Sequence, residues 1–151
     1  MLIREAGIIR QGLPIIFATY HRASRKQMDF IGTSGLMSGL LSFAECLMTP
    51  IEYFESSKYS IIFNKGNIED NEGRMEEIIA FIVLDKDHRL EKYLHKTILP
   101  ILKKLLIKFI SRYNGSNFTK AKQFESFRST IDKIFGSGTL TLDEKVASLI
   151  S

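Results

Sequence analysis

Residues 34–48, SGLMSGLLSFAECLM, form an apolar segment with helical spacing, and no other stretch restricts the possible fold as strongly. Two adjoining sides of the predicted helix are apolar, one with Leu36, Leu40, Phe43 and Leu47 and the next with Met37, Leu41, Ala44 and Met48. Glu45 is its only charged residue, so the helix has almost no polar side to present to water. We therefore expect it to be covered on two sides, by its own sheet and by more protein.

Small side chains also follow one line along this predicted helix, namely Gly35, Gly39, Ser42 and Cys46. Two interpretations remain open: a central helix buried within one domain, or a helix that also forms a dimer surface. In the second interpretation the predicted interface consists of Gly35, Met37, Ser38, Gly39, Leu41, Ser42, Glu45 and Cys46. Cys46 is the only cysteine, and we interpret it as a buried structural thiol because such thiols behave as small hydrophobic groups.

The composition is that of one globular domain. The chain has 151 residues, of which 44% are hydrophobic and 25% charged, which is enough to bury a core. The formal net charge of +4 is low for a dedicated nucleic-acid-binding protein. A single cysteine fits a reducing compartment, no signal peptide is visible, and no apolar run approaches the ~20 residues of a membrane span. We therefore expect a cytoplasmic protein.

Short apolar stretches predict five strands in the first 85 residues. The first two, residues 3–10 and 13–21, are joined at Gln11-Gly12, where a glycine supplies the positive φ of a tight hairpin. Residues 51–55 and 58–65 form a second predicted hairpin with its turn at Ser56-Ser57. Residues 66–76 are polar and predict a loop, and residues 77–85 contain the continuous apolar run IIAFIVL of a central strand.

Helical spacing dominates the rest of the chain. Residues 87–112 predict a long helix with one apolar and one Lys-rich side, kinked at Pro100 and ended by Asn114-Gly115. Residues 119–135 predict another amphipathic helix. Thr141 and Glu144 have the spacing of a capping box, which predicts the start of a short closing helix. The Lys-rich side is interpreted as a solvated surface, with an acidic protein or phospholipid head groups as the alternative contact.

No pattern of catalytic residues is found. The three histidines, His21, His88 and His95, are dispersed, and none forms the i, i+4 pair that binds zinc. The glycines of 35–39 and 136–138 lack the Lys-Ser/Thr of a phosphate-binding loop, and no serine lies in a nucleophile elbow. We therefore predict no catalytic, cofactor-binding or metal-binding residues and expect that the protein is not an enzyme.

Three stretches together resemble a known family. They are GLMSGLLSFAECLM, the hairpin YFESSKYSIIF, and EEIIAFIVLDKD running into the long helix. With the order of elements, they resemble the longin domain, in particular the longin-like proteins of archaea. The resemblance implies an α+β, profilin-like fold: a five-stranded antiparallel sheet with one helix on one face and two or three C-terminal helices on the other. The single longin-like domain would span residues 1–151, with residues 1–135 as its core and 136–151 as an extension.

The resemblance also implies a function without catalysis or cofactors. Longin and roadblock domains pair with one another and bind small Ras-like GTPases in vesicle trafficking and signalling assemblies. For this chain it implies a homodimer, or a heterodimer with another longin or roadblock protein, and a GTPase partner. It implies no nucleic-acid binding and at most a peripheral membrane contact. The alternative is a small-ligand sensor of profilin- or PAS-like outline, with Phe17, Phe63 and Phe81 lining a pocket.

Overall fold

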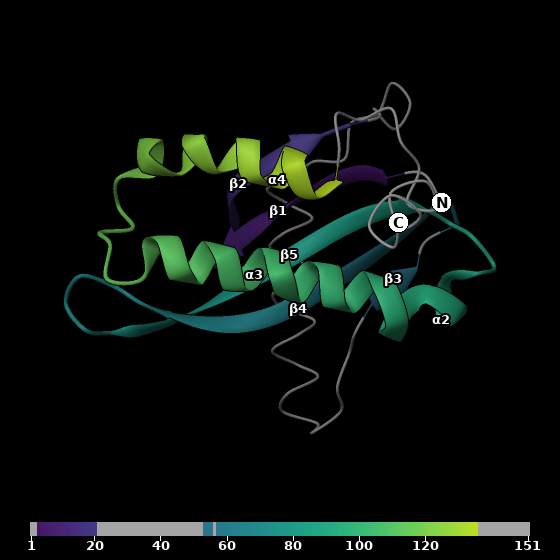
Figure 1. The fold of residues 1–151 in the computed structure, drawn as a ribbon, viewed down its shortest axis with the longest axis horizontal. Coiled ribbons are helices and arrows are strands. Elements are labelled where there is room, and N and C mark those ends of the chain that lie inside the picture. The colour runs from purple at the N-terminus through teal and green to yellow at the C-terminus, as the bar shows by residue number, and fades with distance from the viewer. Residues whose placement is uncertain (1–2, 21–52, 56, 136–151) are drawn as a thin grey trace.

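The computed structural model describes residues 3–20, 53–55 and 57–135 of the chain (Figure 1). Five strands form one antiparallel sheet in the order β2-β1-β5-β4-β3, and helical segments follow it along the chain. The strands are β1 Ile3–Arg10, β2 Leu13–Thr19, β3 Tyr53–Glu55, β4 Tyr59–Glu69 and β5 Met75–Asp85. This confirms the prediction of an α+β fold with a five-stranded antiparallel sheet. The helices predicted over 34–48 and after Thr141 lie outside the described residues.

The β1–β2 hairpin has the predicted turn. Gln11 and Gly12 both have positive φ, 52° and 77°, as a two-residue turn with the right twist requires. β2 ends at Thr19, two residues before the predicted end, although the backbone N–H of Tyr20 still donates to the carbonyl of Arg4 at 2.8 Å.

The β4–β5 hairpin is longer than the sequence predicts. The predicted loop over residues 66–76 is too long: the connection is limited to residues 70–74, because β4 continues to Glu69 and β5 begins at Met75. Most residues of this stretch are polar, but Ile68 is fully buried beneath the helices. Gly66 is also part of the strand, and its missing side chain makes room for Leu106, whose Cδ2 would lie 2.7 Å from an added Cβ.

The tip of this hairpin is fixed by hydrogen bonds. The Asp70 carboxylate accepts from the backbone N–H groups of Glu72 and Arg74, each at 2.9 Å. The backbone of Glu69 is tied to the end of the long helix: its N–H donates to the Asn114 side chain, and its carbonyl accepts from the Gly115 N–H. The tip is therefore an ordered turn of the sheet.

The long helical stretch consists of three segments, α2 Leu90–Tyr93, the π-helical turn η1 Leu94–Ile98 and α3 Leu99–Tyr113. It begins at Leu90, three residues after the predicted start. The predicted disturbance at Pro100 takes the form of the π turn just before it, where the Leu99 N–H donates to the Leu94 carbonyl. A wide turn accommodates a proline, because the proline lacks the N–H that a regular turn would use. α3 ends before Asn114, as predicted.

The next helical stretch is shorter and less regular than predicted. It begins as the 3₁₀ segment η2 Ala121–Phe127 and becomes regular only in α4 Arg128–Phe135. Its apolar side is the predicted one, and all five members are buried: Phe124, Phe127, Ile131, Ile134 and Phe135. In Figure 1, α3 and α4 lie side by side over the same face of the sheet.

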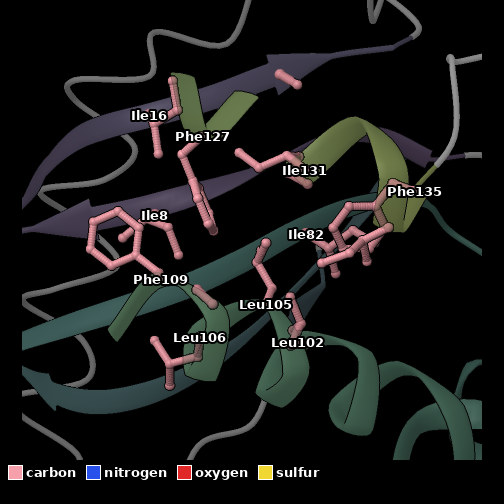
Figure 2. Packing of buried hydrophobic residues seen from close by; sticks show 14 of the residues in the cluster. Ile8, Ile16, Ile82, Leu102, Leu105, Leu106, Phe109, Phe127, Ile131 and Phe135 are labelled. Atoms are coloured by element: carbon pink, nitrogen blue, oxygen red, sulfur yellow. The ribbon is translucent and has the colours of Figure 1, made fainter. Parts of the chain in front are cut away.

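The sheet buries apolar side chains on both faces. On the helix-covered face, alternate strand residues such as Ile8 and Ile82 meet Leu102, Leu105 and Phe109 of α3 (Figure 2). The other residues of the alternation form a second cluster, which consists of Ile9, Phe63, Ile79, Phe81 and Val83. Among the described residues this second cluster contains strand residues alone. β5 contributes to both clusters, which explains why its sequence is continuously apolar.

Candidate functional site

The second apolar face of the sheet, here called the aromatic face, is built around a row of paired strand residues. The row crosses four strands, because Phe17 pairs with Gly7, Gly7 with Phe81, and Phe81 with Phe63. Phe54 of β3 extends it, with its ring centroid 5.1 Å from that of Phe63. The register thus brings together the three phenylalanines that the sequence singled out as candidate pocket residues.

Gly7 in this row is required by close packing. A Cβ at this position would lie 2.4 Å from the carbonyl oxygen of Ile16 and 2.7 Å from the Cβ of Phe17. Both distances are far below van der Waals contact, and a backbone oxygen cannot swing aside as the end of a long side chain can. No local sequence pattern marks Gly7, because its importance follows from the register of the strands.

Glu5 lies in the neighbouring row of the aromatic face, paired with Thr19 on one side and Val83 on the other. Its Oε2 atom is buried and has no hydrogen-bond partner among the described residues. Burial raises the pKa of Glu5 to about 7, because an apolar environment disfavours the ionised carboxylate. Among the described residues, the aromatic face therefore contains a carboxyl group whose charge changes near neutral pH, and no sequence pattern marks this residue.

An open hollow of about 430 Å³ lies at the end of β2. It is lined by Phe17, Ala18, Thr19, Tyr20, Arg128 and Asp132. The Tyr20 hydroxyl donates to the Asp132 carboxylate at 2.8 Å, which joins β2 to α4 beside the hollow. Burial, with the hydrogen bond to Asp132 and its negative charge, raises the pKa of Tyr20 above its usual range, so the hydroxyl stays a neutral donor.

The three candidate pocket residues of the sensor interpretation have different environments. Phe63 and Phe81 are 3% and 0% exposed and pack inside the second cluster. Phe17 alone of the three lines the hollow, and it is partly buried. The predicted interface residues Gly35, Met37, Ser38, Gly39, Leu41, Ser42, Glu45 and Cys46 lie outside the described residues, so the interface stays a prediction.

The outer side of α3 is cationic, as its sequence predicts. Lys103, Lys104, Lys108 and Arg112 are exposed there, whereas the opposite side of the helix is buried in the core. The Arg112 guanidinium donates to Ser126 Oγ at 2.7 Å and lies 5.4 Å from the ring centroid of Tyr113. An exposed apolar residue, Ile107, lies among the lysines and is 53% exposed. We call Lys103, Lys104, Ile107 and Lys108 the cationic face.

Other charged groups serve the structure. The Arg4 Nε lies 2.7 Å from the Asp85 carboxylate and joins β1 to β5. Arg10 forms two hydrogen bonds with Glu76 across the same strand pair. Hydrogen bonding from Arg10 lowers the pKa of Glu76, so this carboxylate is charged and paired at neutral pH.

Within the described parts of the chain, no three His, Cys, Asp or Glu side chains are placed to hold a metal ion. The same residues include no helix that is long and apolar enough to cross a bilayer. His88 and His95 are both exposed, with no metal-binding group assembled around them in this part of the chain.

No protein-family model and no curated protein sequence matches the chain.

Proposed function

We propose that this chain is a non-enzymatic, cytoplasmic interaction module of longin type, which acts as a dimeric platform for a small Ras-like GTPase. The observation that supports this best is the antiparallel sheet with two buried apolar faces. The described helices cover one face, and the order of strands and C-terminal helices agrees with that expected of a longin domain. A fold alone does not determine function, so GTPase binding and dimerisation each need a direct test.

The environment of the ionisable groups also supports a module without catalysis. Arg4, Arg10 and Arg74 each form an ion pair with a carboxylate, and these pairs join strands or close a turn. Glu5 is partly buried among apolar residues, and the described residues place no candidate base or nucleophile against its buried oxygen. The groups with shifted pKa values therefore have structural explanations.

The sensor alternative has weaker support. A ligand pocket in the aromatic face would need space between Phe63 and Phe81, and both rings are instead packed among their neighbours. The hollow at the end of β2 is open, and of the three predicted pocket residues only Phe17 lines it. We therefore retain protein binding as the proposal.

The GTPase proposal is tested by capture. The immobilised protein is incubated with small Ras-like GTPases from the same cell, each loaded with GDP or with a non-hydrolysable GTP analogue. We expect at least one GTPase to bind with a preference for one nucleotide state. If none of them binds in either state, the proposed partner is wrong, whatever the oligomeric state of the chain.

The dimer proposal is tested by light scattering at micromolar concentration, with Gly39→Leu as the variant. If residues 34–48 form the interface, the wild type is dimeric and the leucine blocks close approach, which leaves a folded monomer. If the wild type is a monomer and the leucine lowers the free energy of unfolding by about 1–3 kcal/mol, this segment packs inside its own domain. That second result would remove the proposed interface.

A further inference from the structure

Positive charge is concentrated in one part of this chain. Residues 92–124 contain eight of the 21 Lys and Arg residues and none of the 17 Asp and Glu residues. The remainder, with 13 basic and 17 acidic residues, has a formal net charge of −4. The overall charge of +4 therefore conceals a strongly basic segment on an otherwise acidic protein.

The structure places much of this charge on the surface of the helix layer. Lys103, Lys104 and Lys108 of the cationic face are exposed, and within the described residues none of them has a carboxylate at ion-pair distance. Lys120 and Lys122, around the start of η2, are exposed as well. The C-terminal end of α3 contacts η2, because the Tyr113 hydroxyl donates to the backbone carbonyl of Gln123 at 3.1 Å.

Ile107 gives the cationic face a second property. It is 53% exposed on the side of α3 that points away from the core, since Leu102, Leu105, Leu106 and Phe109 occupy the buried side. At helical spacing Ile107 lies beside Lys103 and Lys104, and Lys108 follows it. Lysines near an anionic bilayer are attracted to its lipid phosphates, and an exposed apolar side chain among them can enter the head-group layer.

We propose that the cationic face binds an anionic phospholipid surface, with α3 parallel to the bilayer, its lysines on the lipid phosphates and Ile107 inserted between head groups. This inference does not depend on GTPase binding or on dimerisation. It assigns a recruitment surface to the helix layer, on the side of the sheet opposite the aromatic face.

Two other anionic partners fit this face less well. Nucleic acids are bound with arginines that contact phosphates in pairs and with exposed aromatic rings that stack on bases. The three cations of the cationic face are lysines, and its exposed apolar residue is an isoleucine. The neighbouring Arg112 already donates to Ser126 Oγ and lies over the ring of Tyr113, which is buried. An acidic protein would need a pocketed contact with anchoring aromatic or arginine residues, whereas this face is the convex side of one helix.

The lysines and Ile107 should contribute separately to the affinity for an anionic membrane. Each basic residue near an anionic membrane contributes about fivefold in affinity, so removal of three lysines should weaken binding on the order of 100-fold. Replacement of Ile107 by Gln removes the inserted apolar group and should weaken binding about fivefold.

The test is co-sedimentation of the full chain with vesicles of phosphatidylcholine alone or of equal parts phosphatidylcholine and phosphatidylglycerol. The first variant is Lys103→Gln/Lys104→Gln/Lys108→Gln. Its matched control, Lys58→Gln/Lys65→Gln/Lys86→Gln, removes the same charge next to or within β4 and β5. Ile107→Gln is the third variant, and circular dichroism checks that each variant is folded.

The proposal expects binding to the phosphatidylglycerol vesicles alone, lost in the first variant, reduced by Ile107→Gln and nearly unchanged in the control. Equal loss in the two triple variants would overturn it, because net charge and not the cationic face would then determine binding. Absence of wild-type binding to anionic vesicles would overturn it directly. Tighter binding to a DNA duplex than to these vesicles at the same salt concentration would also overturn it and indicate a nucleic-acid surface.

Discussion

Gly7 is the residue whose replacement tests the aromatic face most directly. We expect Gly7→Ala to lower the free energy of unfolding by about 1–3 kcal/mol, because the new Cβ meets the fixed carbonyl of Ile16. Gly66→Ala is the matched strand variant. Its Cβ would meet the buried side chain of Leu106, 2.7 Å from Cδ2 and 3.2 Å from Cγ, and a side chain can shift where the Ile16 carbonyl cannot, so the loss should be smaller than that of Gly7→Ala. Urea denaturation of both variants measures the difference, and equal losses would contradict the assigned β1–β2 register.

Glu5 predicts how stability depends on pH. Burial raises its pKa in the folded protein to about 7, from an ordinary value of 4.5. The folded state therefore holds a proton that the unfolded state releases, so the contribution of Glu5 is complete below pH 4.5 and is lost as pH rises through 7. We expect the free energy of unfolding to fall between pH 5 and pH 8, and Glu5→Gln to abolish most of this decrease.

The carboxylates of Glu76 and Asp87 do not mask the decrease in stability that Glu5 causes between pH 5 and pH 8. Arg10 lowers the pKa of Glu76, and hydrogen bonds from Arg89 lower that of Asp87, so both contributions are lost only in acid, below pH 4.5. Glu125→Gln, at an exposed position, is the control and should keep the wild-type dependence. A wild-type stability that stays constant or rises between pH 5 and pH 8 would show that Glu5 is not buried as described.

At the scale of an element, α3 has two sides with different roles. Phe109 is fully buried and contacts Tyr113, Phe124 and Phe127, with ring centroids 4.8–5.6 Å away. We expect Phe109→Ala to lower the free energy of unfolding by about 3–5 kcal/mol. Ile107→Ala, two residues away on the exposed side, should change it by no more than about 0.5 kcal/mol. Thermal unfolding compares the two, and a large loss for Ile107→Ala would show that this residue packs in the core.

The elements also show where sequence reasoning succeeds. The apolar spacing of residues 124–135 identified the buried side of that segment, and continuous apolar residues identified β5 as a central strand. The end of β4 could not be predicted, because Gly66 and Asn67 have low strand propensity and only the contact with Leu106 explains the glycine. Regular spacing likewise predicts neither the π turn at Leu94–Ile98 nor the 3₁₀ geometry of η2.

At the scale of the molecule, the sequence predicts surfaces formed within one helix better than surfaces formed by several strands. The Lys-rich side of the long helix was visible from spacing alone. The aromatic face was not, because the row from Phe17 to Phe63 depends on the register of four strands. Glu5 could not be recognised either, since a single glutamate in a predicted strand has no sequence signature of burial. Long-range pairing determines both features, and periodicity contains no information about it.

The uneven charge of the molecule makes a prediction that needs no partner. A cation-exchange surface adsorbs a protein through its most positive side, and screening limits this attraction to about 10 Å at 0.1 M salt. Lys103→Gln/Lys104→Gln/Lys108→Gln and Lys58→Gln/Lys65→Gln/Lys86→Gln both lower the formal net charge from +4 to +1. We expect the first variant to elute at clearly lower salt than the second, because it removes charge from the adsorbing side. Elution at the same salt concentration would mean that net charge alone governs adsorption, and membrane binding by the cationic face would lose its electrostatic basis.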